Sequence, residues 1–340
     1  MKTYTIFEKP LTVYGIPFFA EQKRLARLSE ELIGQLPQLA RWGRCCAGAR
    51  LAFRTDSPTV RIRLVLKTLR LDRGMSLYAG HSAQVLAGER SDSRYLGVVS
   101  PPDYDTLAFE NTFRKSSQPE QITVYLPRNE EIETVEVSVE DGASVTEPTP
   151  YHYEKPVVFY GSSITEGGCA CNLTNTCSAL LSRWLDFDFC NLGLSGSAKG
   201  ELAVADYINT LNMGAFVYDY DHNAPTAEHL ANTHKPFFDR IRQSHPNIPI
   251  LMLTRPAEVY GEDERVRREI VRATYDAALA AGDQNVYFID GETLLGETDR
   301  CLCTIDGCHL NDLGFYRMAS VIFPVLQDAL NKHGNGGGNE

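Results

Sequence analysis

The second half of the chain alternates short apolar runs with longer segments of helical periodicity, and this alternation constrains the fold more than any other feature. The apolar runs have the length of buried strands, and the segments between them have the spacing of amphipathic helices. The alternation is typical of a three-layer α/β domain with a parallel sheet, which we place at residues 151–332. The runs cover residues 157–160, 187–192, 215–220, 248–253 and 286–289, and the helical segments cover 174–185, 200–211, 227–242, 264–281 and 312–330.

The first half of the chain has a different pattern. Residues 60–67 alternate apolar with basic side chains, as a half-buried strand does, and similar runs follow at 75–78, 121–126 and 134–139. Pro, Gly, Asp and Ser separate these runs. Short strands with frequent turn signals predict an antiparallel β-sandwich, or jelly roll, over residues 1–150.

Three further segments complete the domain plan. Residues 24–36 have the composition of a short helix, and the acidic, proline-bearing segment 140–156 is predicted to link the two domains. The tail 333–340 is rich in Gly and Asn, so we expect it to be disordered.

The composition is that of an ordinary soluble globular protein, since 43% of the 340 residues are hydrophobic and 23% are charged. A net charge of -11 argues against a nucleic-acid or membrane partner, because proteins bind those anionic surfaces through positively charged side chains. The N-terminus lacks the apolar core of a signal peptide, and no run approaches the length of a membrane span. We therefore expect a cytoplasmic protein.

Nine cysteines are present, and free thiols are the default in a cytosolic chain of this size. Two clusters leave a structural zinc site or a disulfide open as alternatives, although two C-x-C pairs match the usual zinc spacing poorly. We therefore expect no metal and no cofactor. The clusters are Cys169, Cys171 and Cys177, and Cys301, Cys303 and Cys308.

Candidate catalytic residues follow the predicted strands, at the sheet edge where ligands bind in parallel sheets. The first strand ends in Gly161-Ser162-Ser163, a sharp turn that would expose a serine hydroxyl. Ser163 is the candidate nucleophile, with Ser162 as its competitor. His309 is the candidate base, and Asp306, three residues earlier, the group that orients it. An Asp-x-x-His before a helix can also be only a cap.

Donors for an oxyanion are available at the same edge. The backbone N–H groups of Ser163 and Gly196 and the amide of Asn223 are the candidates. In the alternative interpretation Gly196 serves only the turn geometry and Asn223 only begins a helix. His222 competes with His309 as base, but its neighbour Asn223 favours an oxyanion role for this segment.

Two other side chains are candidates for contact with the substrate. Arg255 could pair with an acidic group of the substrate or cap the sheet edge, and Glu166 follows Ser163 by one helical turn. Cys308 stands beside the candidate base. We interpret it as loop packing, because no second histidine is expected to activate it.

Four segments together resemble the GDSL, or SGNH, hydrolase superfamily. Residues 160–165 are similar to its first block, with Ser163 at the nucleophile position, and residues 191–196 to its second, with Gly196 at the oxyanion glycine. Residues 221–223 stand where the family has Gly-x-Asn-Asp, and 306–314 resemble its last block.

The chain departs from this pattern at four positions. Ser162 replaces the aspartate of GDSL, and Asp221 and Ala224 replace the Gly and Asp around the family's asparagine. Residues 74–78 resemble the Gly-x-Asp-Leu-Tyr stretch of β-sandwich domains that precede some of these hydrolases, with Ser76 in place of its aspartate.

The resemblance implies a flavodoxin-like hydrolase domain behind a β-sandwich. It implies a serine esterase that removes a short acyl group, acetyl above all, from a small carbohydrate through a Ser163 acyl-enzyme and without a cofactor. The sequence has no long apolar stretch of the kind that would form a lipid-binding lid. Two rivals remain, an inactive carbohydrate-binding protein on the same fold and a zinc-stabilised interaction protein. Homo-oligomerisation stays open.

Overall fold

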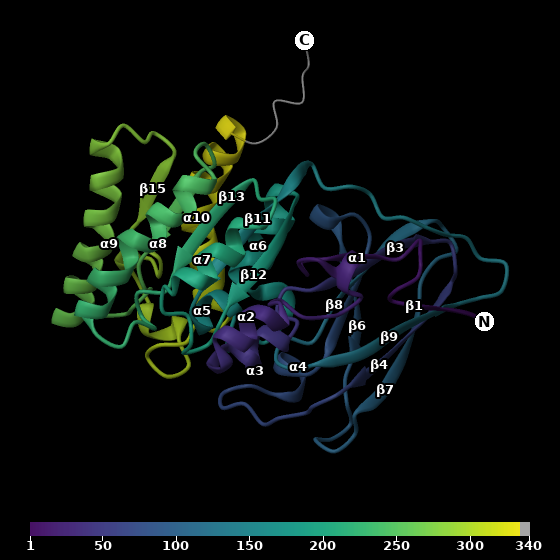
Figure 1. The fold of residues 1–340 in the computed structure, drawn as a ribbon. Helices are drawn as coiled ribbons and strands as arrows, with labels where there is room; N and C mark the ends of the chain where they lie inside the picture. The colour runs from purple at the N-terminus through teal and green to yellow at the C-terminus, as the bar shows by residue number, and fades with distance from the viewer. Residues whose placement is uncertain (334–340) are drawn as a thin grey trace, which may run out of the picture.

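The computed structural model describes the backbone of residues 1–333 and the side chains of residues 1–332. The predicted disordered tail therefore lies, except for the backbone of His333, outside the described residues. Figure 1 shows the parallel sheet with its helices on one side of the molecule and the antiparallel strands on the other.

Five parallel strands form the sheet of the second half in the order β12-β11-β13-β14-β15. Numbered along the chain this is the order 2-1-3-4-5, the doubly wound flavodoxin-like topology that the resemblance implied. The predicted strands are confirmed with small shifts at their ends. Their bounds are β11 Tyr153–Gly161, β12 Phe187–Gly193, β13 Ala215–Asp219, β14 Ile250–Leu253 and β15 Val286–Ile289.

Helices cover both faces of this sheet, and its interior strand β11 is accordingly apolar on both sides. Val157 and Phe159 of β11 pack in one core with α6 and α10, while Val158 and Tyr160 pack in a second core with α7, α8 and α9. The helices are α5 Ser163–Glu166, α6 Cys177–Leu185, α7 Leu202–Asn209, α8 Ala227–Ser244, α9 Glu262–Ala280 and α10 Asp312–His333.

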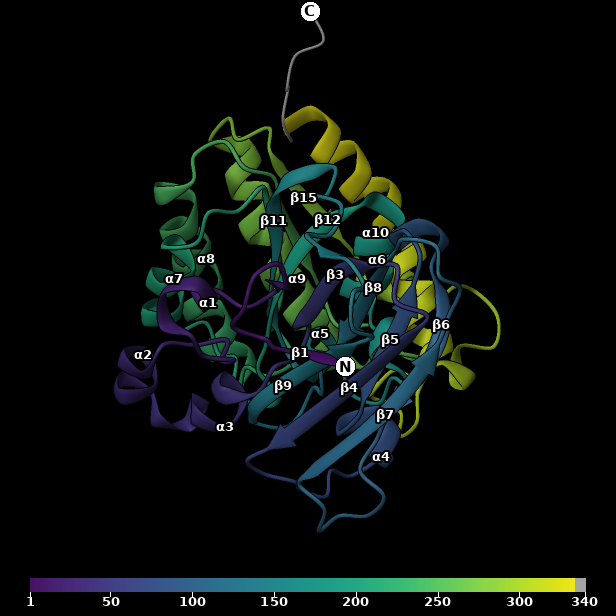
Figure 2. The same ribbon diagram turned by 90° about the vertical axis from the view of Figure 1, so that its right-hand side faces the viewer.

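The first half contains two antiparallel sheets, as predicted, with the orders β1-β9-β4-β7 and β10-β3-β8-β5-β6, where β2 also pairs with β3. A separate apolar core lies between the two sheets. Figure 2 shows β4 and β7 in the foreground of the molecule. The strands are β1 Lys2–Thr5, β2 Thr12–Tyr14, β3 Arg50–Thr55, β4 Thr59–Leu66, β5 Ala83–Ala87, β6 Arg94–Val99, β7 Ala108–Arg114, β8 Glu120–Tyr125, β9 Ile132–Val139 and β10 Val145–Thr146.

Three sequence predictions differ from the structure. The helix at 24–36 is only α2, Glu30–Gln35, capped by Ser29. Residues 75–78 are not a strand, because Ser76 caps the short helix α4, Leu77–Gly80. The segment 140–156 is not a plain linker, since it contains β10 and the start of β11.

The segment around α2 and α3 (Ala40–Arg44) packs on the parallel-sheet half, whereas Phe19 of α1 (Phe19–Gln22) packs on the core of the antiparallel sheets. Leu28, Leu32, Ile33 and Leu39 belong to the same core as α7 and α8 of the parallel-sheet half. The N-terminal half therefore contributes residues to a core of the parallel-sheet half. A domain boundary near residue 150 stays a prediction.

Candidate active site

The turn after β11 sets Ser162 and Ser163 in different surroundings. Ser162 is the N-cap of α5, where its buried hydroxyl accepts a hydrogen bond from the Ile164 N–H at 3.1 Å. Ser163 is the first residue of that helix, half-buried, and it lines a cavity. The structure therefore engages Ser162 in capping and leaves Ser163 as the serine that faces open space.

A buried carboxylate supports this turn from below. Asp219, at the end of β13, accepts hydrogen bonds from the Ser162 N–H at 3.3 Å and from the Thr165 hydroxyl. Burial raises the pKa of Asp219 to about 7, although the bond from Thr165 acts in the opposite direction. A Cβ on Gly161 would clash with the Asp219 carboxylate, so only glycine fits there.

Asp306 and His309 form a close pair before α10. Nδ1 of His309 lies 2.8 Å from Oδ2 of Asp306, and the backbone N–H of His309 donates to Oδ1 at 2.8 Å. Partial burial alone would raise the pKa of Asp306, but the N–H groups of His309 and Cys308 and the imidazole together lower it to about 2. The carboxylate is therefore charged at neutral pH and directs Nε2 of His309 away from itself.

Ser163 and the Asp306–His309 pair line one cavity of about 690 Å³. No hydrogen bond joins Ser163 to His309 in the described part of the chain, an arrangement common in enzymes without bound substrate. Gly196, Asn223 and His222 line the same cavity. The structure thus brings together the candidate nucleophile, base, orienting acid and oxyanion donors from four separate segments.

The antiparallel half also reaches this cavity, which the sequence did not predict. Its contribution comes from α3 and from the loop before α4. The lining residues concerned are Arg41, Trp42, Asp72, Arg73, Gly74 and Met75.

Two of the candidate oxyanion donors follow neighbouring segments of the sheet edge, Gly196 in a tight turn after β12 and Asn223 after β13. Gly196 has φ +65°, in the left-handed region that favours glycine, and it is exposed to the cavity. The amide of Asn223 donates one hydrogen bond to the Leu194 carbonyl oxygen at 3.2 Å, which orients the side chain and leaves its second N–H for a ligand.

Glu166 does not line the cavity, contrary to its predicted contact with substrate. Its side chain is buried, and Oε1 lies 3.2 Å from Nη2 of the fully buried Arg27. Its other oxygen accepts hydrogen bonds from the N–H and hydroxyl of Ser195. Arg27 also donates to the Gly193 carbonyl oxygen at 2.7 Å. Glu166 therefore holds the turn that carries Gly196 against the helix that carries Ser163.

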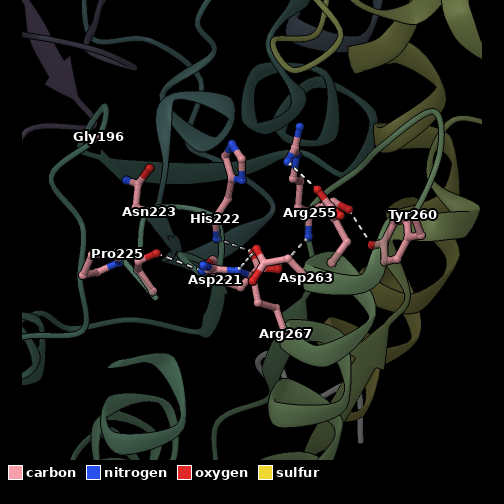
Figure 3. A pocket seen from close by; sticks show the side chains of 11 residues that line it. Gly196, Asp221, His222, Asn223, Pro225, Arg255, Tyr260, Asp263 and Arg267 are labelled. Carbon is pink, nitrogen blue, oxygen red and sulfur yellow. Dashed lines mark hydrogen bonds and ion pairs between the residues drawn. The ribbon is translucent and has the colours of Figure 1, made fainter. Parts of the chain in front are cut away.

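A second cavity, of about 410 Å³, adjoins the first past Gly196, His222 and Asn223 (Figure 3). Arg255 lines it and forms an ion pair with Glu264 at 3.2 Å. The Asp221 carboxylate accepts the backbone N–H groups of His222 and Arg255, at 2.9 and 3.1 Å. Burial raises the pKa of Asp221 to about 6. In Figure 3 the side chains of His222 and Arg255 project to the same side.

Contrary to our expectation, a second histidine does lie beside Cys308. Nε2 of His222 is 3.2 Å from its Sγ. Burial and the nearby Arg255 lower the pKa of His222 to about 4, and burial raises the pKa of Cys308. The pair is therefore a neutral imidazole beside a thiol at neutral pH, which is a poor arrangement for a thiolate nucleophile.

The cysteine clusters do not form a metal-ligand set. All nine cysteines are free, and within residues 1–333 no group of three His, Cys, Asp or Glu side chains is placed to hold a metal ion. Nor does any helix in these residues have the length and apolar character needed to cross a membrane.

A model of the GDSL-like lipase/acylhydrolase family matches residues 154–327, just over half of the chain. The chain belongs to this family. A GxDLY model, described as the N-terminus of SGNH-hydrolase-type esterases, matches residues 3–145. The GDSL protein is thus a serine ester hydrolase with a GxDLY half, as its motifs predicted. No curated protein sequence is significantly similar to it.

Solved structures share the fold across nearly the whole chain. A GDSL-like lipase from Bacteroides ovatus has 24% identity and a TM-score of 0.87, over 97% of this chain and 98% of that one. The salicylyl-acyltransferase SsfX3 of a tetracycline biosynthetic pathway has 20% identity and a TM-score of 0.77, over 94% and 95%. A family two carbohydrate esterase from Clostridium thermocellum, in complex with cellohexaose, has 14% identity and a TM-score of 0.63, over 84% and 93%.

Two departures from the GDSL and GxDLY motifs have a structural explanation. Ser162 stands in place of the GDSL aspartate and caps α5, and Ser76 stands in place of the GxDLY aspartate and caps α4 through a hydrogen bond from the Ala79 N–H at 3.2 Å. Serine and aspartate are both favoured N-caps, so each exchange preserves the local hydrogen bond.

Proposed function

We propose that the protein removes a short acyl group, typically acetyl, from a carbohydrate through an acyl-enzyme on Ser163. The observation that carries this proposal is the position of the Asp306–His309 pair on the same cavity as the half-buried Ser163. The catalytic domain in this account is residues 151–332, and residues 1–150 form the accompanying sandwich domain.

In the acylation step Ser163 Oγ attacks the ester carbonyl carbon, and its proton passes to Nε2 of His309. The charged Asp306 stabilises the imidazolium that forms. The N–H groups of Ser163 and Gly196 and the Asn223 amide bind the oxyanion. As the tetrahedral intermediate collapses, the bond to the alcohol breaks and His309 returns the proton to the leaving oxygen.

Deacylation repeats the sequence with water. His309 takes a proton from a water molecule, whose oxygen attacks the acyl carbon. Ser163 then leaves with that proton, and the carboxylic acid is released. No group outside the chain is needed for the electron and proton balance of either step.

The choice of a carbohydrate ester is supported by the site's surroundings. The cavity is lined by several charged and polar side chains together with Trp42, a composition suited to a polar ligand with apolar ring faces. The family two carbohydrate esterase shares the fold.

Hydrolysis of an aryl acetate by the wild type and by Ser163→Ala tests the proposal, with Ser162→Thr as the matched control that keeps a capping hydroxyl. We expect Ser163→Ala to lose about a thousandfold or more in kcat. Equal rates in wild type and Ser163→Ala would overturn the role of Ser163. Sugar binding without turnover of any ester would favour the inactive binding protein.

A further inference from the structure

One wall of the cavity comes from the antiparallel half, and it is built rigidly. The loop that contains Asp72 and Arg73 begins after β4 and ends at α4. Three consecutive residues, Arg128, Asn129 and Glu130, hold this loop, and all three are at most 2% exposed.

Glu130 fixes both ends of the loop. Its carboxylate accepts hydrogen bonds from the Thr68 hydroxyl at 2.5 Å and from the Arg70 N–H at 2.8 Å, and it lies 2.8 Å from Nδ1 of His81. Asn129 fixes the middle, because its Nδ2 donates to Asp72 Oδ2 at 2.7 Å.

The same segment connects the wall to the catalytic turn. Arg128 donates a hydrogen bond to the carbonyl oxygen of Gly167, the C-cap of the helix that begins with Ser163. Its Nε donates to the Asn129 side chain at 3.1 Å. The position of the Asp72–Met75 wall is therefore set relative to Ser163 by direct contacts.

The two arginines on this wall differ in whether an acidic side chain balances their charge. Arg41 pairs with Asp72 at 2.5 Å and stacks over the Trp42 ring at 4.1 Å, so its charge is balanced. Arg73 is exposed and lines the cavity, yet it has no ion pair or hydrogen bond with any residue of the described chain. In a protein of net charge -11 this leaves one unbalanced cation at the cavity.

We propose that this wall is the subsite for the alcohol half of the ester, and that it selects a sugar bearing an anionic group. The sugar lies against this wall and its anion pairs with Arg73, whose planar fork suits a carboxylate or a phosphate. This inference rests on the proposed esterase function for its catalytic consequence, but the binding it describes does not depend on turnover.

The test compares kcat/KM for an acetylated uronic acid, an acetylated sugar phosphate and an acetylated neutral sugar. We expect the wild type to favour at least one anionic substrate over the neutral one by about tenfold, the scale of a charge-assisted hydrogen bond. Arg73→Gln is expected to abolish that ratio through KM, and Arg73→Glu to reverse it. Comparing kcat/KM for the uronic acid and the sugar phosphate shows whether carboxylate or phosphate is the better ligand.

Arg70→Gln is the matched control, because the Arg70 side chain is exposed on the same loop and does not line the cavity. It should keep the wild-type ratio. Equal rates for all three substrates in the wild type, or equal effects of the two glutamine variants, would overturn the proposal.

Calorimetric binding of the deacetylated anionic sugar to Ser163→Ala separates this inference from the esterase itself. Binding that Arg73→Gln weakens about tenfold supports the subsite even if no ester is hydrolysed. Absence of binding, together with Ser163-dependent hydrolysis of an aryl acetate, would reject the subsite and retain the esterase.

Discussion

The guanidinium of Arg27 lies 3.2 Å from the carboxylate of Glu166, and both side chains are excluded from solvent. This ion pair joins the segment before α2 to the helix that begins with Ser163. Glu166 also binds Ser195, so the pair fixes the distance between the candidate nucleophile and the candidate oxyanion turn. The N-terminal segment is thereby part of the framework of the candidate active site.

Glu166→Ala should destabilise the protein by about 3–5 kcal/mol, because it leaves the buried Arg27 cation without its partner. Denaturant unfolding measures this change. Asp239→Ala, which breaks the exposed pair with Lys235, is the control and should cost at most about 1 kcal/mol. Similar losses in both variants would contradict the structural role given to Glu166.

Gly161→Ala should destabilise the protein by several kcal/mol and abolish activity, since its Cβ would displace Asp219 from beneath the catalytic turn. Gly34→Ala is its counterpart in α2, where an added Cβ meets nothing within 4 Å. That variant should gain about 0.5–1 kcal/mol from its better helix propensity. An unaffected Gly161→Ala enzyme would show that the turn is looser than described.

Asp219 should make the protein less stable as pH rises. Its pKa is about 7 in the folded state, above the unfolded value of about 3.9, so the native state binds more protons between these values. Its stabilising contribution is complete below about pH 4 and is lost as pH rises through about 7. Thermal unfolding of Asp219→Asn should show a flatter dependence on pH across this window. An unchanged slope would exclude Asp219 as its source.

The parallel sheet could be predicted from the sequence because each buried strand is recognisable from its own short apolar run. Once Ser163 and Gly196 are placed at strand ends and His309 before the last helix, the sheet topology brings them to one edge. The order of strands and the motif spacing were therefore sufficient to bring the candidate residues to one side of the cavity.

The opposite wall could not be predicted in this way. Trp42 lies on the short helix α3 and Arg73 on a loop, and the residues that hold this loop, such as Asn129, are distant in sequence. The same holds for His222 and Cys308, which are 86 residues apart. One local signal was misread, because Ser76 before an apolar pair is a helix cap and was included in a strand.

Trapping of the acyl-enzyme tests the central claim most directly. The protein is mixed with an excess of an aryl acetate, quenched in acid during the first turnovers, digested and mapped by mass spectrometry. The account predicts one acetyl group on the peptide 160–168, located at Ser163 by fragmentation, and its absence in Ser163→Ala. An acetyl group on Ser162 or Cys308, or rapid turnover with no acetylated peptide, would contradict it.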